Sequence, residues 1–222
     1  MPATVRQNNL AVEAMVLDVQ YLPSLPYFVC LSSAGKTVLD IHENFQKQSY
    51  RNRCRILTSQ GVHELVIPLR KPTHHVPVRD IRIDNRQNWS SHHWKSICSA
   101  YGKSPWFHYY AEGFGKFFSA GFEFLCEFNL ALINHCQHVL GIPGVYHLSD
   151  SYMKNCQENI FDARSLIHPK KDLRDLFFYQ PAPYLQSFGV NFVSNLSIID
   201  LLFNEGPESG LNLARCYMPV KQ

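Results

Sequence analysis

The densest group of polar side chains in the sequence is the twelve-residue segment from His42 to Arg53. It carries two guanidiniums, an ammonium, a carboxylate, an imidazole and four amides, and apolar runs flank it on both sides. In an extended segment Arg51 and Arg53 project to the same side, and paired N–H donors of this kind bind phosphates and carboxylates well. We therefore expect these two arginines to form the core of an anion site, with Gln46 and Lys47 beside them. The alternative is a solvated loop or an exposed strand.

Three side chains are candidates for a general base. His42 and Glu43 open the polar segment, and His93 stands in a later stretch that has helical periodicity. An imidazole or a carboxylate within hydrogen-bonding reach of an attacking amine can take its proton. The residue types alone do not choose among the three.

Asp200 and Asn204 form a second polar pair. They lie four residues apart on one face of an otherwise apolar helical stretch. Two polar groups on such a face need a shared polar partner or a ligand. We expect buried contacts from this pair to the segment from Tyr184 to Gln186 or to a ligand-binding loop. A plain capping or core-network role is the alternative.

Two other patterns carry less chemistry. Residues 34–37 imitate the end of a phosphate-binding loop, but Cys30 stands where that motif needs a glycine. The adjacent pairs His74–His75 and His92–His93 point in different directions on a strand or a helix, so neither chelates one metal easily. The sequence therefore predicts no metal site and identifies no cofactor.

Two apolar strands position the polar segment. The runs over 14–20 and 36–41 have the character of buried strands, with a short helix over 27–33 between them. A strand, a helix and a strand in this order predict a parallel sheet. Ligands of open α/β sheets lie beyond the carboxyl ends of the strands. Gln20 and Tyr21 after the first strand should therefore meet His42 and Glu43 after the second.

The rest of the chain predicts a hairpin followed mainly by helices. Residues 54–58 and 62–68 should form the hairpin, and 81–84 a brief strand. Helices are expected over 89–100, 122–140 and 195–203, and the glycine-containing stretch before 121 is left open. Loops around a short helix are expected over 159–183. We predict a single α/β domain over 1–222. Its sheet-rich part, 14–84, holds a mostly parallel sheet with a β-hairpin, covered by middle and C-terminal helices from the mostly helical part, 88–222.

Composition excludes several classes of protein. The 222 residues are 45% hydrophobic and 18% charged with a formal net charge of +3, which favours neither disorder nor electrostatic binding to nucleic acid. Glu123 and Glu127 interrupt the most apolar stretch, so no membrane insertion is predicted. The composition does not indicate an oligomeric state.

The cysteines indicate a reducing compartment. All seven are widely spaced, their number is odd, and no C-x-x-C pair occurs. This pattern predicts reduced thiols rather than a disulfide framework, and the N-terminal residues lack the order of a signal peptide. We therefore expect a cytoplasmic protein.

Long motifs in the sequence resemble those of the WbqC-like protein family, and they cover nearly the whole chain. The matching pieces are Gln20–Phe28, Asp40–Arg53, Trp89 with His93–Trp94, Ala100–Tyr101 with Ser104–Phe107, and Leu196–Pro207. The resemblance implies a link to bacterial surface-polysaccharide (O-antigen) biosynthesis, where transfer of a glycyl or other aminoacyl group to an amino sugar has been suggested.

The leading functional hypothesis is a small-molecule transferase that moves an acyl or aminoacyl group to a sugar. Arg51 and Arg53 would hold the anionic donor, and His42, Glu43 or His93 would deprotonate the attacking amine. A non-catalytic ligand-binding or scaffold protein of a polysaccharide operon is the alternative, since it would keep the anion site without a tuned base. Nucleotidyl transfer is a third hypothesis, although no glycine-rich loop follows Val19.

Overall fold

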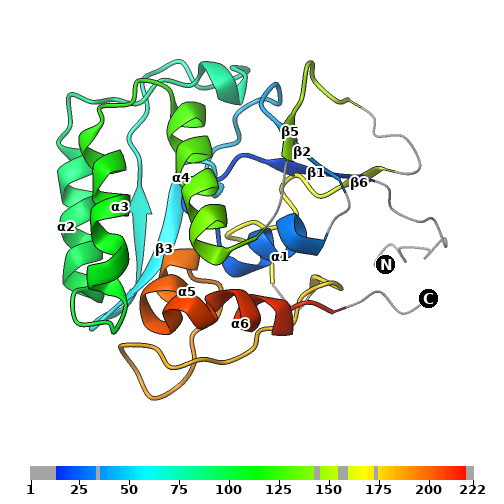
Figure 1. Cartoon of the computed structure of the whole chain (residues 1–222). Coiled ribbons are helices and arrows are strands. Elements are labelled where there is room, and N and C mark those ends of the chain that lie inside the picture. Colours follow the sequence, from blue (N-terminus) through cyan, green and yellow to red (C-terminus); the bar gives the residue numbers. More distant parts are fainter. Residues whose placement is uncertain (1–13, 34–35, 143–145, 155–159, 173–174, 219–222) are drawn as a thin grey trace.

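The computed structural model describes residues 14–33, 36–142, 146–154, 160–172 and 175–218. It contains a four-stranded sheet and a separate two-stranded hairpin, with helices packed around them (Figure 1). The four-stranded sheet occupies one side of the molecule in this view, and the helices α2 (Trp89–Tyr101) and α3 (Phe107–Ser119) occupy the opposite side.

A parallel sheet forms the framework of the site, and β1 (Ala14–Asp18) is at its centre. β1 pairs with β2 (Thr37–Asp40) on one side and with β6 (Ile160–Asp162) on the other, and β5 (Tyr146–Leu148) pairs with β2. All three pairings are parallel. The helix α1 (Leu25–Ser33) connects β1 to β2, so the strand, helix and strand predicted at the start of the chain are confirmed.

β5 and β6 come from a part of the chain for which the sequence predicted no strand. Loops around a short helix were expected over 159–183, and this expectation is wrong for β6 (Ile160–Asp162), which is a strand. Both strands are three residues long and carry two apolar residues each, which is too short to show an alternating pattern. They are strands because β1 and β2 offer them free edges to pair with.

The predicted hairpin is confirmed. β3 (Arg53–Thr58) and β4 (Gly61–Val66) pair antiparallel in continuous register from Arg53–Val66 to Thr58–Gly61. The turn needs a glycine at its last position, because Gly61 has φ +98°, a conformation that residues with side chains rarely adopt.

The strand predicted over 81–84 is absent from the described structure. This segment follows η1 (Val78–Asp80) and makes only isolated bridges, from Arg82 to Phe124 and from Ile83 to Leu69. Because successive residues bridge to different partners, no ladder of strand hydrogen bonds extends in either direction.

Three helices pack side by side next to the hairpin: α2 (Trp89–Tyr101), α3 (Phe107–Ser119) and α4 (Leu125–Leu140). The sequence left α3 open because glycine weakens a helix. A Cβ on Gly113 would lie 2.9 Å from the imidazole of His135, and a Cβ on Gly115 would lie 3.2 Å from the indole of Trp94. The two glycines therefore allow α3 to approach both of its neighbours closely.

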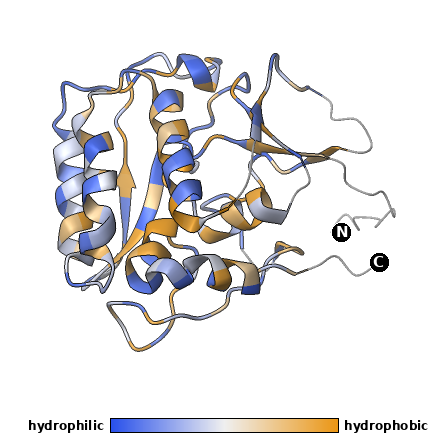
Figure 2. Cartoon of the chain, viewed as in Figure 1, coloured by the Kyte–Doolittle hydropathy of each residue, from blue (hydrophilic) through white to orange (hydrophobic). Residues whose placement is uncertain are grey.

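The C-terminal part consists of α5 (Ile198–Glu205), η3 (Gly206–Glu208) and α6 (Ser209–Arg215). Ser197 caps α5, because its hydroxyl accepts a hydrogen bond from the backbone N–H of Ile199. Hydrophobic residues gather where α1, α5 and β3 approach one another (Figure 2). Within the described ranges no helix is both long and apolar enough to span a membrane. The predicted α/β fold class is confirmed.

Candidate functional site

Two carboxylates stand side by side at the carboxyl edge of the parallel sheet. Asp18 ends β1, Asp40 ends β2, and the two are paired in register. Both are almost completely buried, which is costly for a carboxylate without a cation. Nη1 of Arg51 lies 3.2 Å from Oδ2 of Asp18, and Nη1 of Arg164 lies 2.5 Å from Oδ2 of Asp40. Each acid therefore has its own guanidinium.

Arg51 is an internal cation. Its side chain is fully buried, and it donates to Glu43 through two bonds of 2.8 Å, Nε to Oε1 and Nη2 to Oε2. Nη2 also lies 3.1 Å from the hydroxyl of Ser165. Two carboxylates and a hydroxyl surround Arg51, and it lines neither of the two cavities described below. Its position instead ties the strand ends to the polar segment.

Arg53 lies elsewhere, and the prediction that Arg51 and Arg53 share one face is wrong. Residue 51 is in a turn, and extended geometry begins only at Arg53, the first residue of β3. Arg53 donates from Nη1 to Oε2 of Glu64 at 2.7 Å. Between them Asn52 is buried, and its Nδ2 donates to the carbonyl oxygen of Ile67 at 2.9 Å. The two arginines therefore belong to different surroundings.

Glu43 combines burial with access to a cavity. Burial raises the pKa of its carboxyl to about 7, and the hydrogen bonds from Arg51 oppose that rise. Its backbone N–H, like that of His42, donates to Oδ1 of Asp40. A carboxyl with a pKa near neutrality can both accept and release a proton at cellular pH.

Glu43 lines a cavity of about 450 Å³ that we call the sheet-edge cavity. The cavity's other lining residues come from the chain after β2, from the end of β6 and the turn after it, and from two further loops: Asn44, Phe45, Gln46, His74, His75, Tyr152, Asp162, Arg164 and Ser165. β2 and then β5 are added on one side of β1, and β6 is added later on the other side of β1. The strand order therefore reverses at β1. Crevices where strand order reverses in this way are the usual ligand sites of open α/β sheets.

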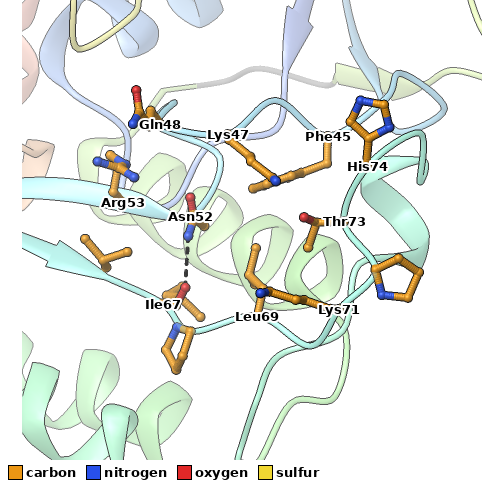
Figure 3. A pocket seen from close by; sticks show the side chains of 13 residues that line it. Phe45, Lys47, Gln48, Asn52, Arg53, Ile67, Leu69, Lys71, Thr73 and His74 are labelled. Carbon is orange, nitrogen blue, oxygen red and sulfur yellow. Dashed lines mark hydrogen bonds between the residues drawn. The ribbon is translucent and has the colours of Figure 1, made fainter.

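A second cavity of about 870 Å³, the basic cavity, lies between the polar segment and the chain that follows β4 (Figure 3). Three cationic side chains line it, Lys47, Arg53 and Lys71. The remaining lining residues are Phe45, Gln48, Asn52, Val66, Ile67, Pro68, Leu69, Pro72, Thr73 and His74. Phe45 and His74 line both cavities, so the two spaces are neighbours.

The two candidate histidines lie outside these two cavities. His93 is buried, and its Nδ1 is 3.0 Å from the hydroxyl of Tyr21. Burial lowers the pKa of His93 to about 4, so its ring is neutral. His42 is half-buried beside Arg79, whose Nη1 lies 3.2 Å from both ring nitrogens. Among the three proposed bases, Glu43 alone lines either described cavity.

Some of the remaining predicted binding residues near the sheet edge support the site from behind, and the others line a cavity. Gln20 is buried and donates from Nε2 to Oδ2 of Asp18 and to the carbonyl oxygen of Ile167. Gln46 lines the sheet-edge cavity and accepts a hydrogen bond from Ser165, while Lys47 lines the basic cavity. Gln20 therefore orients the site without lining either cavity.

Asp200 makes the buried contacts that the sequence indicated. It accepts hydrogen bonds from the hydroxyls of Tyr101 and Tyr184, at 2.9 and 2.6 Å, and from Nε2 of Gln186 at 2.9 Å. Asn204 donates to the backbone carbonyl of Asp200 and accepts from Ser187. This network joins α5 to α2 and to the segment before α5. Neither Asp200 nor Asn204 lines the two cavities.

Several site residues were missed by sequence reasoning. Asp18 and Asp40 carried a usable signal, since each is an acid at the end of a buried apolar run. Arg164 and Ser165 carried none, because they reach the site only through β6, which the pattern did not reveal. Within the described residues no cluster of His, Cys, Asp or Glu side chains is arranged to hold a metal.

The fold and the site define an α/β protein with a crevice at the carboxyl edge of a parallel sheet and a basic cavity beside it. The model of the WbqC-like protein family matches residues 19–168 and 161–211, so the chain belongs to this family. It is 26% identical over 226 residues to "Uncharacterized protein Rv1507c" of Mycobacterium tuberculosis, covering 90% of this chain and 97% of the relative. No solved structure gives a significant match.

Proposed function

We propose that the protein is a small-molecule transferase and that its two neighbouring cavities hold its two substrates. The observation that carries this proposal is the position of Glu43. Its carboxyl, with a pKa of about 7, lines the sheet-edge cavity, and that cavity shares Phe45 and His74 with a cavity lined by three cations. A base beside an anion site is the arrangement that transfer from an anionic donor requires.

The residues have separate roles in this proposal. Arg53, Lys47 and Lys71 hold the anionic donor in the basic cavity. The acceptor occupies the sheet-edge cavity, where its amine or hydroxyl attacks the donor's acyl carbon. The new bond to nitrogen or oxygen forms, the bond to the leaving group breaks, and the leaving group keeps that electron pair. Glu43 accepts the proton that the nucleophile loses.

Family membership supports a narrower form of the proposal. The group transferred would be an acyl or aminoacyl group, and the acceptor an amino sugar of bacterial surface polysaccharide. The scattered thiols support a cytoplasmic location for this step, and the six cysteines in the described residues are free. Cys156 lies outside the described residues.

A non-catalytic binding protein is the second candidate. The fully paired Arg51–Glu43 bridge favours it, because a carboxylate held by two hydrogen bonds is a weaker base than a free one. In that case the basic cavity would bind an anion without any reaction at Glu43.

One experiment separates the two candidates. The purified protein is incubated with activated acyl and aminoacyl donors and amino-sugar acceptors, and products are detected by mass spectrometry. In parallel, thermal shift reports donor binding, for which a ligand at 100 times its Kd adds about 2.7 kcal/mol to stability. The transferase proposal predicts that Glu43→Gln loses product formation and keeps donor binding. Donor binding without product in the unmodified protein favours the binding protein.

A further inference from the structure

Two residues that line the basic cavity each have a buried polar atom whose hydrogen-bonding capacity is unused. Oδ1 of Asn52 and Nε of Arg53 have no hydrogen-bond partner, and both residues line the cavity. Buried polar groups in folded proteins nearly always have a partner, so each unused group calls for one. One is an acceptor and the other a donor, and they come from adjacent residues.

The orientation of Asn52 is fixed by its own backbone and amide. Its Nδ2 donates to the carbonyl oxygen of Ile67, and its carbonyl oxygen accepts from the N–H of Ile67. Figure 3 shows the side-chain nitrogen facing Ile67 and the oxygen on the opposite side. The amide cannot rotate to satisfy Oδ1 without breaking the bond that Nδ2 makes. Among the described residues no group donates to this oxygen, and a ligand in the cavity that Asn52 lines is one source of a donor.

The charge around the cavity restricts what that donor can be. Lys47, Lys71 and Arg53 all line the same space, and Glu64 neutralises Arg53 only through Nη1. Three cations disfavour an ammonium group on the ligand and favour an anion. The donor for Oδ1 of Asn52 is then a neutral hydroxyl or amide, while Nε of Arg53 and the two lysines take the anion.

We infer that the basic cavity binds a phosphorylated small molecule that carries a neutral hydroxyl or amide beside its phosphate, as sugar phosphates and nucleotides do. The inference rests on the proposed function, because it assigns this chemistry to the donor. The apolar wall of Phe45, Ile67 and Leu69 would contact the ring of the sugar or base. A phosphate has more oxygens for several cationic donors than a carboxylate has, and so matches the cavity better.

Isothermal titration of the full chain tests the inference with four probes: inorganic phosphate, glucose 1-phosphate, uridine diphosphate and uridine. We expect glucose 1-phosphate or uridine diphosphate to bind at least about tenfold more tightly than inorganic phosphate, and more tightly than uridine, because each charge-assisted bond adds affinity. The better of the two identifies a sugar or a base as the ring. Equal affinity for uridine and uridine diphosphate, or no binding by any probe, would overturn the inference.

Variants locate the binding. Arg53→Lys keeps the charge and removes Nε, so it should weaken all phosphorylated probes by about tenfold. Asn52→Ala should reduce the affinity for glucose 1-phosphate relative to the affinity for inorganic phosphate. Because both affinities are measured on the same variant, their ratio is insensitive to a loss of folded protein. Lys71→Met should weaken phosphate binding. Its control is Lys95→Met, an exposed lysine on α2 that makes the same change in charge. Equal weakening by both lysine variants would contradict binding in the basic cavity.

Failure of this inference differs from failure of the proposed function. The titrations involve no turnover. Phosphate-dependent binding without any transfer product would therefore contradict the transferase proposal and leave the inference standing. Transfer from donors that lack a phosphate, with no binding of the four probes, would do the reverse.

Discussion

The carboxylates of Asp18 and Asp40 occupy paired positions on neighbouring parallel strands, yet each binds a different arginine. Arg51 reaches Asp18 from the turn before β3, and Arg164 reaches Asp40 from the turn after β6. Two buried acids at neighbouring positions would repel each other without these cations. The two ion pairs therefore fasten distant segments to the strand ends. They also place Glu43, whose carboxylate binds Arg51 and whose backbone N–H donates to Asp40.

Removing Arg164 should destabilise the protein strongly. The variant Arg164→Met leaves Asp40 buried beside Ser149 without its cation, and breaking a buried pair in this way costs about 3–5 kcal/mol. Urea denaturation measures the change. Lys116→Met is the control, because the ion pair of Lys116 with Glu112 is exposed on both sides and little effect is expected. Similar losses for both variants would contradict the assignment of Asp40 as a buried anion.

The pH dependence of stability should contain a contribution from Glu43. The folded pKa is about 7 against an ordinary value of 4.5, so the native state holds more protons between these pH values. The free energy of unfolding therefore decreases as pH rises from about 4.5 to 7, by on the order of 3 kcal/mol at about 1.4 kcal/mol per unit. Glu43→Gln should lack this decrease.

His93 should contribute with the opposite sign. Its pKa is about 4 in the folded protein and 6.5 ordinarily, so the unfolded state holds more protons in this range and stability falls as pH falls. The two contributions oppose each other between pH 4.5 and 6.5. Of these two contributions Glu43→Gln keeps only that of His93, so its unfolding free energy should rise more steeply with pH than that of the unmodified protein. Parallel curves from urea denaturation across this range would show that the carboxyl titrates elsewhere.

Asp200→Ala should lower the free energy of unfolding. The substitution leaves the hydroxyls of Tyr101 and Tyr184 without their acceptor, and each unsatisfied group costs about 1–3 kcal/mol. Asp200→Asn keeps a side-chain carbonyl as acceptor and should lose less. Chemical denaturation ranks the three proteins, and donor binding at the basic cavity should stay unchanged because Asp200 does not line it. A loss of binding at unchanged stability would instead place Asp200 in the ligand site.

Thermal stability should not depend on disulfides. The six cysteines in the described residues are free, and five of them are buried. Melting curves with and without a reductant should coincide. A bridge worth about 2–4 kcal/mol would lower the melting temperature by several degrees on reduction, which would contradict the prediction.

Local pattern predicted most of the fold, and it failed where pairing partners lie far apart in sequence. The hairpin, α2, α4 and α5 have strong periodicity or clear turn residues, and all are present. β5 and β6 are set by the open edges of β2 and β1 rather than by their own residues. α3 was obscured by Gly113 and Gly115, whose role is visible only once the neighbouring helices are in place.

The sequence predicted the place of the candidate site in the fold better than the contacts within it. The polar segment after β2 does line a cavity at the carboxyl edge of the sheet and a second cavity beside it. The error at Arg51 has a clear origin. The alternation of a strand was assumed to include residue 51, but this residue is in a turn and β3 begins only at Arg53. A sequence pattern does not reveal that Asp18 and Glu43 already surround this arginine, since those contacts depend on the register of the sheet.

The rate of transfer as a function of pH, in the unmodified protein and in Glu43→Gln, tests the central claim most directly. The substrates are the donor and acceptor pair that gives product by mass spectrometry. A general base works when it is deprotonated, so we predict that kcat/KM rises with pH through about 7 in the unmodified protein. In Glu43→Gln we predict a rate at least about a hundredfold lower with no such rise. The same rate and the same profile in both proteins would contradict the proposed role of Glu43.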